Sequence, residues 1–505
     1  MTADGTMKAI RVRLLTGSYF GFLGTLTSVV GNFTISVILA RLLGTSGLGV
    51  YTIYSVLGVV LIPLLSLSIP SAVTRYTSQL RQKNPERLSG LLPTGFTILL
   101  AMGAVGVGVI LLFVAPFAET IYSEPLLRPM LAILALSLLA NITGLFAGGV
   151  LQGLEEFQSA SLVGALGVAA NVPVLLWLVP SFGPVGAALS GAVTAVFYAA
   201  LSGYTALQAL RRHGVAWSWA FSRAEARNLL KFVGPINVAS FLARGSALVQ
   251  NSLVAIYLGF LNLGLLRVAG VFNNAVLFFP RTLIAPLLPI LTSMVSTRSP
   301  ERSKDIISQL VRLALILVIP IAVGLVLALP AATEVLYGGE YAPAVPLATV
   351  LIFAAVLTFP NAIMGEQYLL ATGRTLHALL VTAYSVSSGL VLVVVLLPTL
   401  GTMALPVAGL TSELTLFAIL IVWLDRKNEL ALRALLPTTF FGICAPAAAY
   451  GLARTLPQQT AAVLALPLAV LIGALGYRFL ITRDERTLLL STLKIRKSAF
   501  AGGYR

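Results

Sequence analysis

Long apolar stretches are the feature of this 505-residue sequence that most restricts its fold. A helix needs about 20 mostly apolar residues to cross a bilayer, and fourteen runs between charges or Gly/Pro breaks meet that need. Because only 10% of the residues are charged, against about 25% in soluble domains, the sequence predicts an all-α integral membrane protein and excludes a soluble enzyme. The predicted spans lie near residues 15–40, 46–70, 91–115, 129–150, 159–180, 184–210, 232–258, 263–291, 306–330, 343–371, 375–398, 402–424, 435–453 and 461–481.

The distribution of Lys and Arg supports this division, since cytoplasmic loops carry an excess of positive charge. With the N-terminus inside, the segments predicted inside hold 27 of the 33 Lys and Arg residues, and those predicted outside hold only four. We therefore expect a multi-pass protein of the cytoplasmic membrane with both termini inside, a retained signal-anchor as its first span, and a basic cytoplasmic tail at 482–505. The formal charge of +16 then reflects topology, and we expect no nucleic-acid partner.

An internal repeat predicts how the spans are grouped. The pattern L-G-x-x-x-L-G occurs at residues 43–49 and again at 258–264, an offset of 215. A pair of glycines at 183 and 191 matches a pair at 401 and 409, an offset of 218. We expect two six-helix lobes, 1–212 and 228–427, followed by two additional transmembrane helices within 435–481. Two like-oriented lobes would enclose a cleft of the kind in which transporters bind their substrates.

Polar side chains inside the predicted spans are the candidates for binding. A charge near the centre of a membrane helix costs about 2.5–3.5 kcal/mol on insertion scales, so it usually has a function and a partner. Guanidinium stays protonated and binds phosphate in a bidentate manner. We therefore expect Arg244, Arg281 and Arg267 to hold a phosphate or pyrophosphate; the alternative is that they pair with acids or snorkel to an interface. The residues that share helical faces are Asn237, Ser240, Arg244 and Asn251, then Arg267, Asn274 and Arg281, and finally Thr25, Ser28, Asn32 and Ser36.

Two acidic residues inside spans are candidates for ion coupling. Glu413 lies near the centre of the span at 402–424, and Glu366 lies towards the inner end of the span at 343–371. A buried, isolated carboxyl group can carry a proton, whereas one beside an arginine stays ionised. Glu413 is therefore either a site for H⁺ or Na⁺ coupling or a structural partner of Arg244, and cytoplasmic water could reach Glu366.

Catalytic and metal-binding patterns are missing from the sequence. The only cysteine, Cys444, stands in an apolar stretch, and the two histidines, His213 and His377, are far apart in sequence. No Walker A, HExxH, GxSxG or kinase signature is present. We expect no catalytic residue, no metal and no cofactor, and hence a protein that is not an enzyme.

Three amino-terminal motifs resemble those of polysaccharide transporter (oligosaccharide flippase, Wzx-like) proteins. They are the run from Ala40 to Tyr51, the run from Ser68 to Tyr76, and Leu151-Gln152-Gly153-Leu154. This family belongs to the superfamily that also contains lipid II flippases of the MurJ type and MATE multidrug exporters. The resemblance implies a V-shaped fold of two six-helix lobes, and alternating access that moves polyprenyl-pyrophosphate-linked sugars to the outer leaflet. Arg41 and Arg75 fall within the matching motifs, where they could contact headgroups or pair structurally.

The resemblance favours one function and leaves others open. We expect a flippase for a polyprenyl-pyrophosphate-linked oligosaccharide in cell-surface polysaccharide synthesis, with membrane lipids, a polysaccharide polymerase and glycosyltransferases as further partners. Lipid II flipping is the first alternative. A MATE-like exporter is a weaker one because the polar spans carry arginines rather than carboxylates. A membrane glycosyltransferase, ligase or polymerase would need more acid/base residues at a membrane face than the short outer loops supply.

Overall fold

A computed structural model describes residues 3–215, 217–219, 221–284, 291, 300–427, 432–476 and 478. All regular structure among these residues is helical. The described residues divide into two compact units, Met1–Arg267 and Val268–Arg505. The division falls within one long helix, and the predicted lobe boundaries at 212 and 228 remain a prediction.

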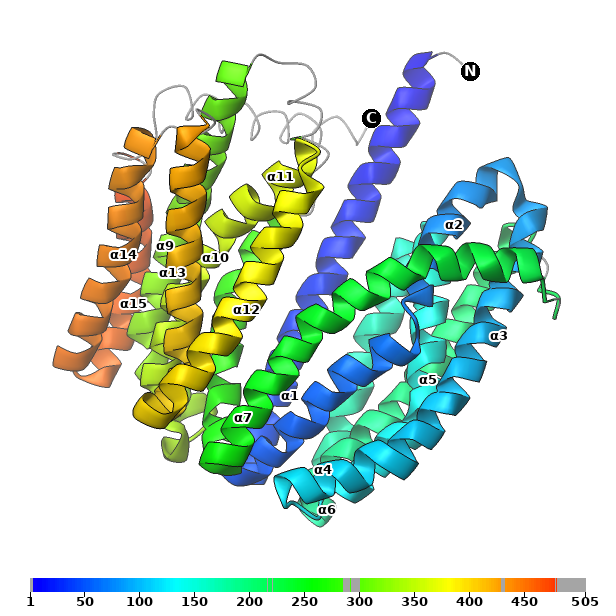
Figure 1. Cartoon of the computed structure of the whole chain (residues 1–505), viewed down its shortest axis with the longest axis horizontal. Coiled ribbons are helices and arrows are strands. Elements are labelled where there is room, and N and C mark those ends of the chain that lie inside the picture. The colour runs from blue at the N-terminus through cyan, green and yellow to red at the C-terminus, as the bar shows by residue number, and fades with distance from the viewer. Residues whose placement is uncertain are drawn as a thin grey trace. The chain divides into compact units, whose positions relative to one another are not determined.

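The first unit is built around α5 (Leu127–Gly153), which packs against α6 (Phe157–Arg212), α2 (Ile69–Lys83) and α3 (Pro85–Val109). A π-helical turn at Ile110–Val114 joins α3 to α4 (Ala115–Tyr122). The long helix α1 (Ala3–Leu65) packs against α6. Figure 1 shows α1 running away from the N-terminus and then reversing its direction towards α2.

Glycines at the turns explain why helices continue where the sequence predicts two separate spans. In α1 only Gly44 leaves helical geometry, with φ 65° and ψ −178°, and in α7 (Arg223–Ile284) only Gly259 does so, with φ 84° and ψ 170°. A positive φ is readily adopted only by glycine. These two glycines are equivalent positions of the repeated motif, so the repeat is also present in the backbone conformation.

The second glycine pair of the repeat behaves in the same way. Gly183 lies inside α6 with φ 56° and ψ −134°, and Gly401 follows α12 (Thr375–Leu400) with φ 53° and ψ −128°. After Gly401 a short 3₁₀ turn at Gly401–Met403 leads into α13 (Ala404–Arg426). Each glycine thus lets a helix end and a second one begin within one or a few residues.

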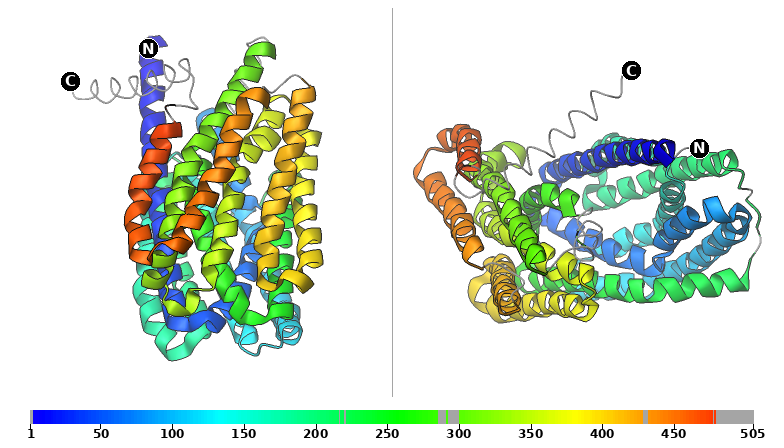
Figure 2. Two further views of the ribbon diagram at one scale, coloured as in Figure 1. Left: turned by 90° about the vertical axis from the view of Figure 1, so that its left-hand side faces the viewer. Right: turned by 90° about the horizontal axis from the view of Figure 1, so that it is seen from above.

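The second unit is built around α9 (Pro300–Leu336), which packs against α10 (Ala344–Ala362), α14 (Leu432–Thr455) and α15 (Gln458–Leu475). A 3₁₀ turn at Gly339–Tyr341 joins α9 to α10. A π-helical segment at Ile363–Tyr368 and a short α11 (Leu369–Ala371) extend α10, and α13 packs against both α10 and α12. The views of Figure 2 show these helices running side by side.

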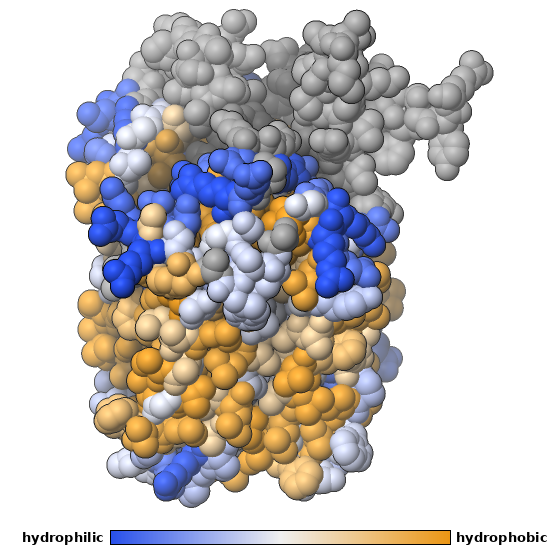
Figure 3. Space-filling model, turned by 90° about the vertical axis from the view of Figure 1, so that its right-hand side faces the viewer, coloured by the Kyte–Doolittle hydropathy of each residue, from blue (hydrophilic) through white to orange (hydrophobic). Residues whose placement is uncertain are grey.

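The surface is that of a membrane protein. Large apolar side chains are widely exposed, for example Leu112 at 71%, Leu136 at 74% and Trp177 at 75%. Such extensive exposed apolar surface is rare on soluble monomers. Figure 3 shows a broad hydrophobic band on one face, with a hydrophilic zone at one end and smaller hydrophilic patches at the other. Lipid contact accounts for this band.

Nine helical stretches among the described residues are long and apolar enough to cross a membrane. Some are much longer than the roughly 20 residues that one crossing needs, such as Phe157–Arg212 with 56 residues. The all-helical membrane fold that the sequence predicts is therefore confirmed, while the count of fourteen crossings remains a prediction.

Candidate functional site

The central arginine of the predicted binding face, Arg244, reaches from α7 to α1. Its Nη1 donates a hydrogen bond of 3.3 Å to the backbone carbonyl of Val59. Val59 stands four residues before Pro63, which lies inside α1. Proline has no N–H, so the carbonyl four residues earlier loses its helical donor. Arg244 supplies that donor across the two helices.

Asn237, seven residues before Arg244 on the same face of α7, holds the end of α1. Its side chain is buried, and its Nδ2 donates to the carbonyl of Leu64 at 3.2 Å. Its Oδ1 accepts a 3.3 Å hydrogen bond from the hydroxyl of Ser68. The last carbonyls of a helix receive no hydrogen bond from within that helix. Asn237 of α7 therefore supplies a donor to such a carbonyl where α1 ends, and it also binds Ser68 just before α2.

Arg244 nevertheless keeps capacity for a ligand. Its side chain is exposed, and a guanidinium carries five N–H donors, of which one is directed to Val59. Arg244 is the first residue of the apolar stretch Arg244–Phe278. The guanidinium therefore has N–H donors left for a ligand.

Other polar residues of the predicted faces bond locally. The Nδ2 of Asn251 donates to the carbonyl of Ala247, and that of Asn32 donates to the carbonyl of Ser28. Both asparagines belong to helices α7 and α1 of the first unit, and Asn32 is exposed. The buried hydroxyl of Ser36 has no hydrogen-bond partner among the described residues. The side chains of Thr25 and Ser240 lie outside the described residues.

Two further predicted arginines, Arg41 and Arg267, lie next to the repeated motif. Arg41 is exposed just before the Gly44 turn of α1. Arg267 is exposed after the Gly259 turn of α7, within electrostatic range of Tyr51. The part of Arg41 and Arg267 in a phosphate site therefore remains a prediction.

Arg75 makes an aromatic contact. Its guanidinium carbon lies 4.4 Å from the ring centroid of Phe232 and 5.9 Å from that of Tyr76. The rings of Tyr76 and Phe232 meet edge to face with centroids 5.8 Å apart. A cation over an aromatic face is attracted by the ring quadrupole, so Arg75 of α2 packs against the start of α7.

A polar cluster in the second unit surrounds Glu413 of α13. Asn361 of α10 donates its Nδ2 to Glu413 Oε2 at 2.6 Å and to the Glu413 backbone carbonyl at 3.0 Å. Thr358 donates its hydroxyl to Glu413 Oε1 at 3.1 Å. The Oδ1 of Asn361 is buried and, within the described part of the chain, has no hydrogen-bond partner. The cluster therefore offers carboxylate, amide and hydroxyl oxygens in one place.

The remaining predicted site residues are dispersed. Glu366 is exposed on the π-helical segment Ile363–Tyr368, eight positions beyond Thr358 in the sequence. Asn274 is exposed on the second half of α7. The side chain of Arg281 lies outside the described residues, so its part in a phosphate site remains a prediction.

The structure also reveals polar residues that the sequence did not single out. Arg312 of α9 is only 9% exposed within the described span Ile307–Leu336. Because it stands near the start of the predicted span at 306–330, the sequence alone did not distinguish it from the arginines of the preceding loop. Tyr122 of α4 and Ser252 of α7 share a 2.5 Å hydrogen bond between their hydroxyls. No spacing in the sequence predicts this pair, because the two residues lie on different helices and are 130 positions apart.

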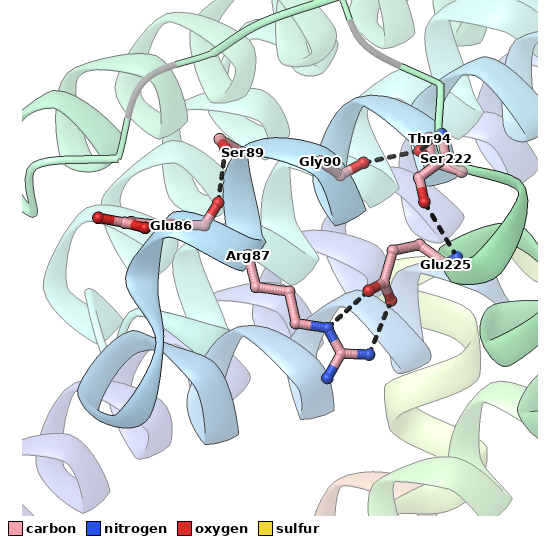
Figure 4. Close-up of polar contacts among 7 residues, drawn as sticks. All are labelled: Glu86, Arg87, Ser89, Gly90, Thr94, Ser222 and Glu225. Atoms are coloured by element: carbon pink, nitrogen blue, oxygen red, sulfur yellow. Dashed lines mark hydrogen bonds and ion pairs between the residues drawn. The ribbon is translucent and has the colours of Figure 1, made fainter.

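The segment before α7 is fixed to α3, as Figure 4 shows. Arg87 binds Glu225 through two hydrogen bonds, Nε to Oε1 at 2.5 Å and Nη2 to Oε2 at 3.1 Å. The backbone N–H of Ser222 donates to the hydroxyl of Thr94 at 2.9 Å, and the Ser222 hydroxyl accepts from the N–H of Glu225. These bonds hold the first turn of α7, the helix that carries Arg244, against α3.

An aromatic cluster adds to this anchor. Trp217 and Trp219, from the segment before α7, pack edge to face with centroids 5.7 Å apart. Trp217 also meets Phe96 and Phe146 at 5.8 and 6.5 Å. Aromatic pairs of this kind contribute about 0.5–1.5 kcal/mol beyond their buried area.

The chemistry that these residues support is binding. An accessible guanidinium at the beginning of an apolar stretch can bind a phosphate, and the cluster at Glu413 can hold a proton or a small cation. Among the described residues, no group of three or more His, Cys, Asp or Glu side chains could hold a metal ion.

Comparison with solved structures identifies the fold. The chain is similar to the structure of the lipid II flippase MurJ in an inward closed conformation, with a TM-score of 0.71, 14% identity, and coverage of 94% of this chain and 100% of that one. It is also similar to an inward-facing multidrug resistance MATE transporter of the MOP superfamily, with a TM-score of 0.65, 14% identity, and coverage of 79% and 94%. A MOP superfamily transporter from Pyrococcus furiosus matches with a TM-score of 0.58, 14% identity, and coverage of 82% and 95%.

These likenesses establish a MurJ- and MATE-like fold. No curated protein matches the sequence. A family model described as "polysaccharide biosynthesis protein" matches residues 38–346, which is more than half of the chain and includes the motifs at residues 40–51 and 68–76. The chain therefore belongs to the family of polysaccharide biosynthesis proteins.

Proposed function

We propose that this protein is a flippase for a polyprenyl-pyrophosphate-linked oligosaccharide, which it moves across the cytoplasmic membrane by alternating access for cell-surface polysaccharide synthesis. The family and the transporter fold support this function. In this proposal both termini lie in the cytoplasm, as the distribution of Lys and Arg predicts.

The single observation that carries the proposal is the exposed guanidinium of Arg244 on α7, where the apolar stretch Arg244–Phe278 begins. A membrane arginine is costly unless it is used, and one hydrogen bond to Val59 engages only part of its donor capacity. A diphosphate linker is the part of the substrate that needs such a group, because it carries charge through the bilayer. We assign the first contact with the linker to Arg244; Arg281, Arg267, Asn237, Asn274, Asn32, Arg41 and Arg75 are the further candidates.

Ion coupling in this proposal belongs to Glu413, with Glu366 as the second candidate. Glu413 is held by Thr358 and Asn361 between α10 and α13. Loss or gain of one positive charge would change the hydrogen bonds that join these two helices. The coupling ion is H⁺ or Na⁺.

Lipid II is the second candidate substrate. The observation that favours it is the structural likeness to MurJ, which covers 94% of this chain. Lipid II also carries its sugars on a polyprenyl diphosphate, so the same arginine would serve. The two substrates differ in the glycan, and only a transport measurement separates them.

Complementation tests the proposal. The gene is expressed in two bacterial strains, one lacking its own oligosaccharide flippase and one depleted of its lipid II flippase, and surface polymer and cell lysis are measured. Restored polymer export without rescue of lysis is expected. Rescue of lysis alone would replace the proposed substrate by lipid II, and failure in both strains despite membrane insertion would contradict a flippase.

Arg244→Gln is the informative variant in this assay. Glutamine keeps a polar side chain with N–H donors but loses the charge, so folding is expected to survive while export falls at least tenfold, the loss of about one charge-assisted hydrogen bond. Arg227→Gln, at an exposed arginine of the same helix, is the matched control and is expected to export normally.

A further inference from the structure

A separate cavity lies in the second unit where the ends of four helices meet. It has a volume of about 430 Å³, within the roughly 300–1,000 Å³ typical of small-molecule sites. Its walls come from the end of α9, the start of α10, the end of α14 and the start of α15. These ends lie at the lower side of this unit in Figure 1. None of the residues predicted to bind phosphate or to couple an ion lines this cavity.

Two opposite charges line the cavity without binding each other. Glu334 of α9 and Arg454 of α14 both belong to its wall, and both side chains are exposed. No ion pair within 4.0 Å joins them in the described structure, although Arg128 and Glu119 do pair, at 3.5 Å. A carboxylate and a guanidinium that line one cavity without pairing favour a ligand with both a positive and a negative group.

The cationic side of the cavity is well defined. The guanidinium carbon of Arg454 lies 5.2 Å from the ring centroid of Tyr450, which also lines the cavity. Gln458 is the first residue of α15, and the first N–H groups of a helix have no acceptor within it. Arg454 and this helix end together favour an anionic group, while Glu334 favours a cationic one.

The wall becomes apolar away from these charges. Pro330 and Val326 line the cavity four and eight residues before Glu334 on α9, so with a rise of about 1.5 Å per residue the wall extends roughly 12 Å along that helix. Val345 and Pro346 of α10 supply the facing apolar wall. The cavity therefore has charged groups at the helix ends and an apolar interior that runs along the helices.

We propose that this cavity binds the headgroup and the first part of an acyl chain of a zwitterionic phospholipid of the phosphoethanolamine class. Arg454 binds the phosphate, Glu334 accepts hydrogen bonds from the primary ammonium, and the apolar wall contacts the acyl chain. A phosphoglycerol headgroup has no cation for Glu334, and a quaternary ammonium has no N–H to donate to it. The site is independent of the proposed transport function.

Lipid binding to the purified full-length protein tests the site. The protein is titrated in detergent with phosphatidylethanolamine, phosphatidylcholine or phosphatidylglycerol of identical acyl chains, and the first binding event is quantified by native mass spectrometry. Phosphatidylethanolamine is expected to bind about tenfold more tightly than the other two, as one additional charge-assisted hydrogen bond provides. Glu334→Gln is expected to abolish this preference, and Arg454→Gln to weaken all three lipids.

Matched variants locate the bound lipid. Ala453→Trp places a large side chain in the cavity wall and is expected to remove the tight binding event, whereas Ala447→Trp, at an exposed position of the same helix, is expected to leave it unchanged. Glu124→Gln and Arg128→Gln control for charge at sites outside the cavity. Equal binding of the three lipids, tighter phosphatidylglycerol binding that Glu334→Gln does not alter, or tight binding that persists in Ala453→Trp would overturn the proposal.

Discussion

Gly49 and Gly264, equivalent positions of the internal repeat, each face the backbone turn of the other copy. A Cβ on Gly49 would lie 1.9 Å from the carbonyl oxygen of Phe260, and one on Gly264 would lie 2.0 Å from the carbonyl oxygen of Thr45. Both contacts belong to the first unit. The turn of α1 and the turn of α7 therefore pack reciprocally, at a distance that only glycine permits.

Alanine at either position is expected to destabilise the first unit. The clash is with backbone rather than with a flexible side chain, so one of the turns must move, and overpacking of this kind costs about 1–3 kcal/mol or more. The expected result is a lower midpoint of thermal unfolding for Gly49→Ala and Gly264→Ala in detergent. Gly270→Ala, in α7 with nothing within 4 Å of its Cβ, should unfold like the wild type; equal unfolding of all three variants would contradict the close packing.

The ion pair between Arg87 and Glu225 is expected to hold the start of α7 on α3. Glu225 is the more buried partner, with a side-chain exposure of 12% against 44% for Arg87. Arg87→Ala leaves this carboxylate without its bidentate partner and should lower the free energy of unfolding by about 1–2 kcal/mol, moderated by the exposure of Arg87.

A double-mutant cycle separates the interaction energy of the Arg87–Glu225 pair from the contacts that each side chain makes with its surroundings. Arg87→Ala and Glu225→Ala together should cost less than the sum of the single variants. Additive effects on thermal unfolding would show that the two side chains do not stabilise each other. Arg128→Ala, which removes an exposed pair with Glu119, is the control and should have little effect.

The cluster at Glu413 is expected to control the ion dependence of transport. Glu413→Gln keeps the side-chain size and one acceptor oxygen for Asn361, and its amide N–H can donate to the Thr358 hydroxyl, but it cannot be ionised. Transport by this variant should become insensitive to the imposed H⁺ or Na⁺ gradient, measured as transport rate in proteoliposomes with and without each gradient. Glu366→Gln tests the second candidate, and an unchanged gradient response in both variants would exclude them from coupling.

The turns could be predicted from the sequence because the backbone conformations open to glycine depend little on tertiary contacts. A positive φ needs glycine almost regardless of the surroundings, so Gly44 and Gly259 mark equivalent turns at a constant offset of 215. The separation of helices was harder to predict, because one non-helical residue inside α6, Gly183, suffices to turn the chain. Apolar windows therefore predict separate crossings, whereas the observed helices run through the turns.

The partners of the polar residues could not be predicted in the same way. Periodicity placed Asn237 and Arg244 on one face of α7, but their acceptors, the carbonyls of Leu64 and Val59, are more than 170 positions away. The Val59 carbonyl lacks a helical donor because Pro63 has no N–H, and this local effect can be read from the sequence. Tertiary packing, however, decides which helix supplies the missing donor. Thr358 and Asn361 beside Glu413 depend on packing for the same reason.

The most direct measurement of the central hypothesis is flipping by purified protein. Vesicles that contain the protein and a fluorescently labelled polyprenyl-pyrophosphate-linked oligosaccharide are treated with a membrane-impermeant quencher, and the rate at which the inner-leaflet label becomes accessible is recorded. The wild type should accelerate this rate over protein-free vesicles. Arg244→Lys should retain part of the activity, Arg244→Gln should lose at least tenfold, as expected when a charge-assisted contact is removed, and Arg227→Gln should match the wild type. Wild-type vesicles no faster than protein-free ones, or folded Arg244→Gln as fast as the wild type, would contradict a flippase that holds its diphosphate through Arg244.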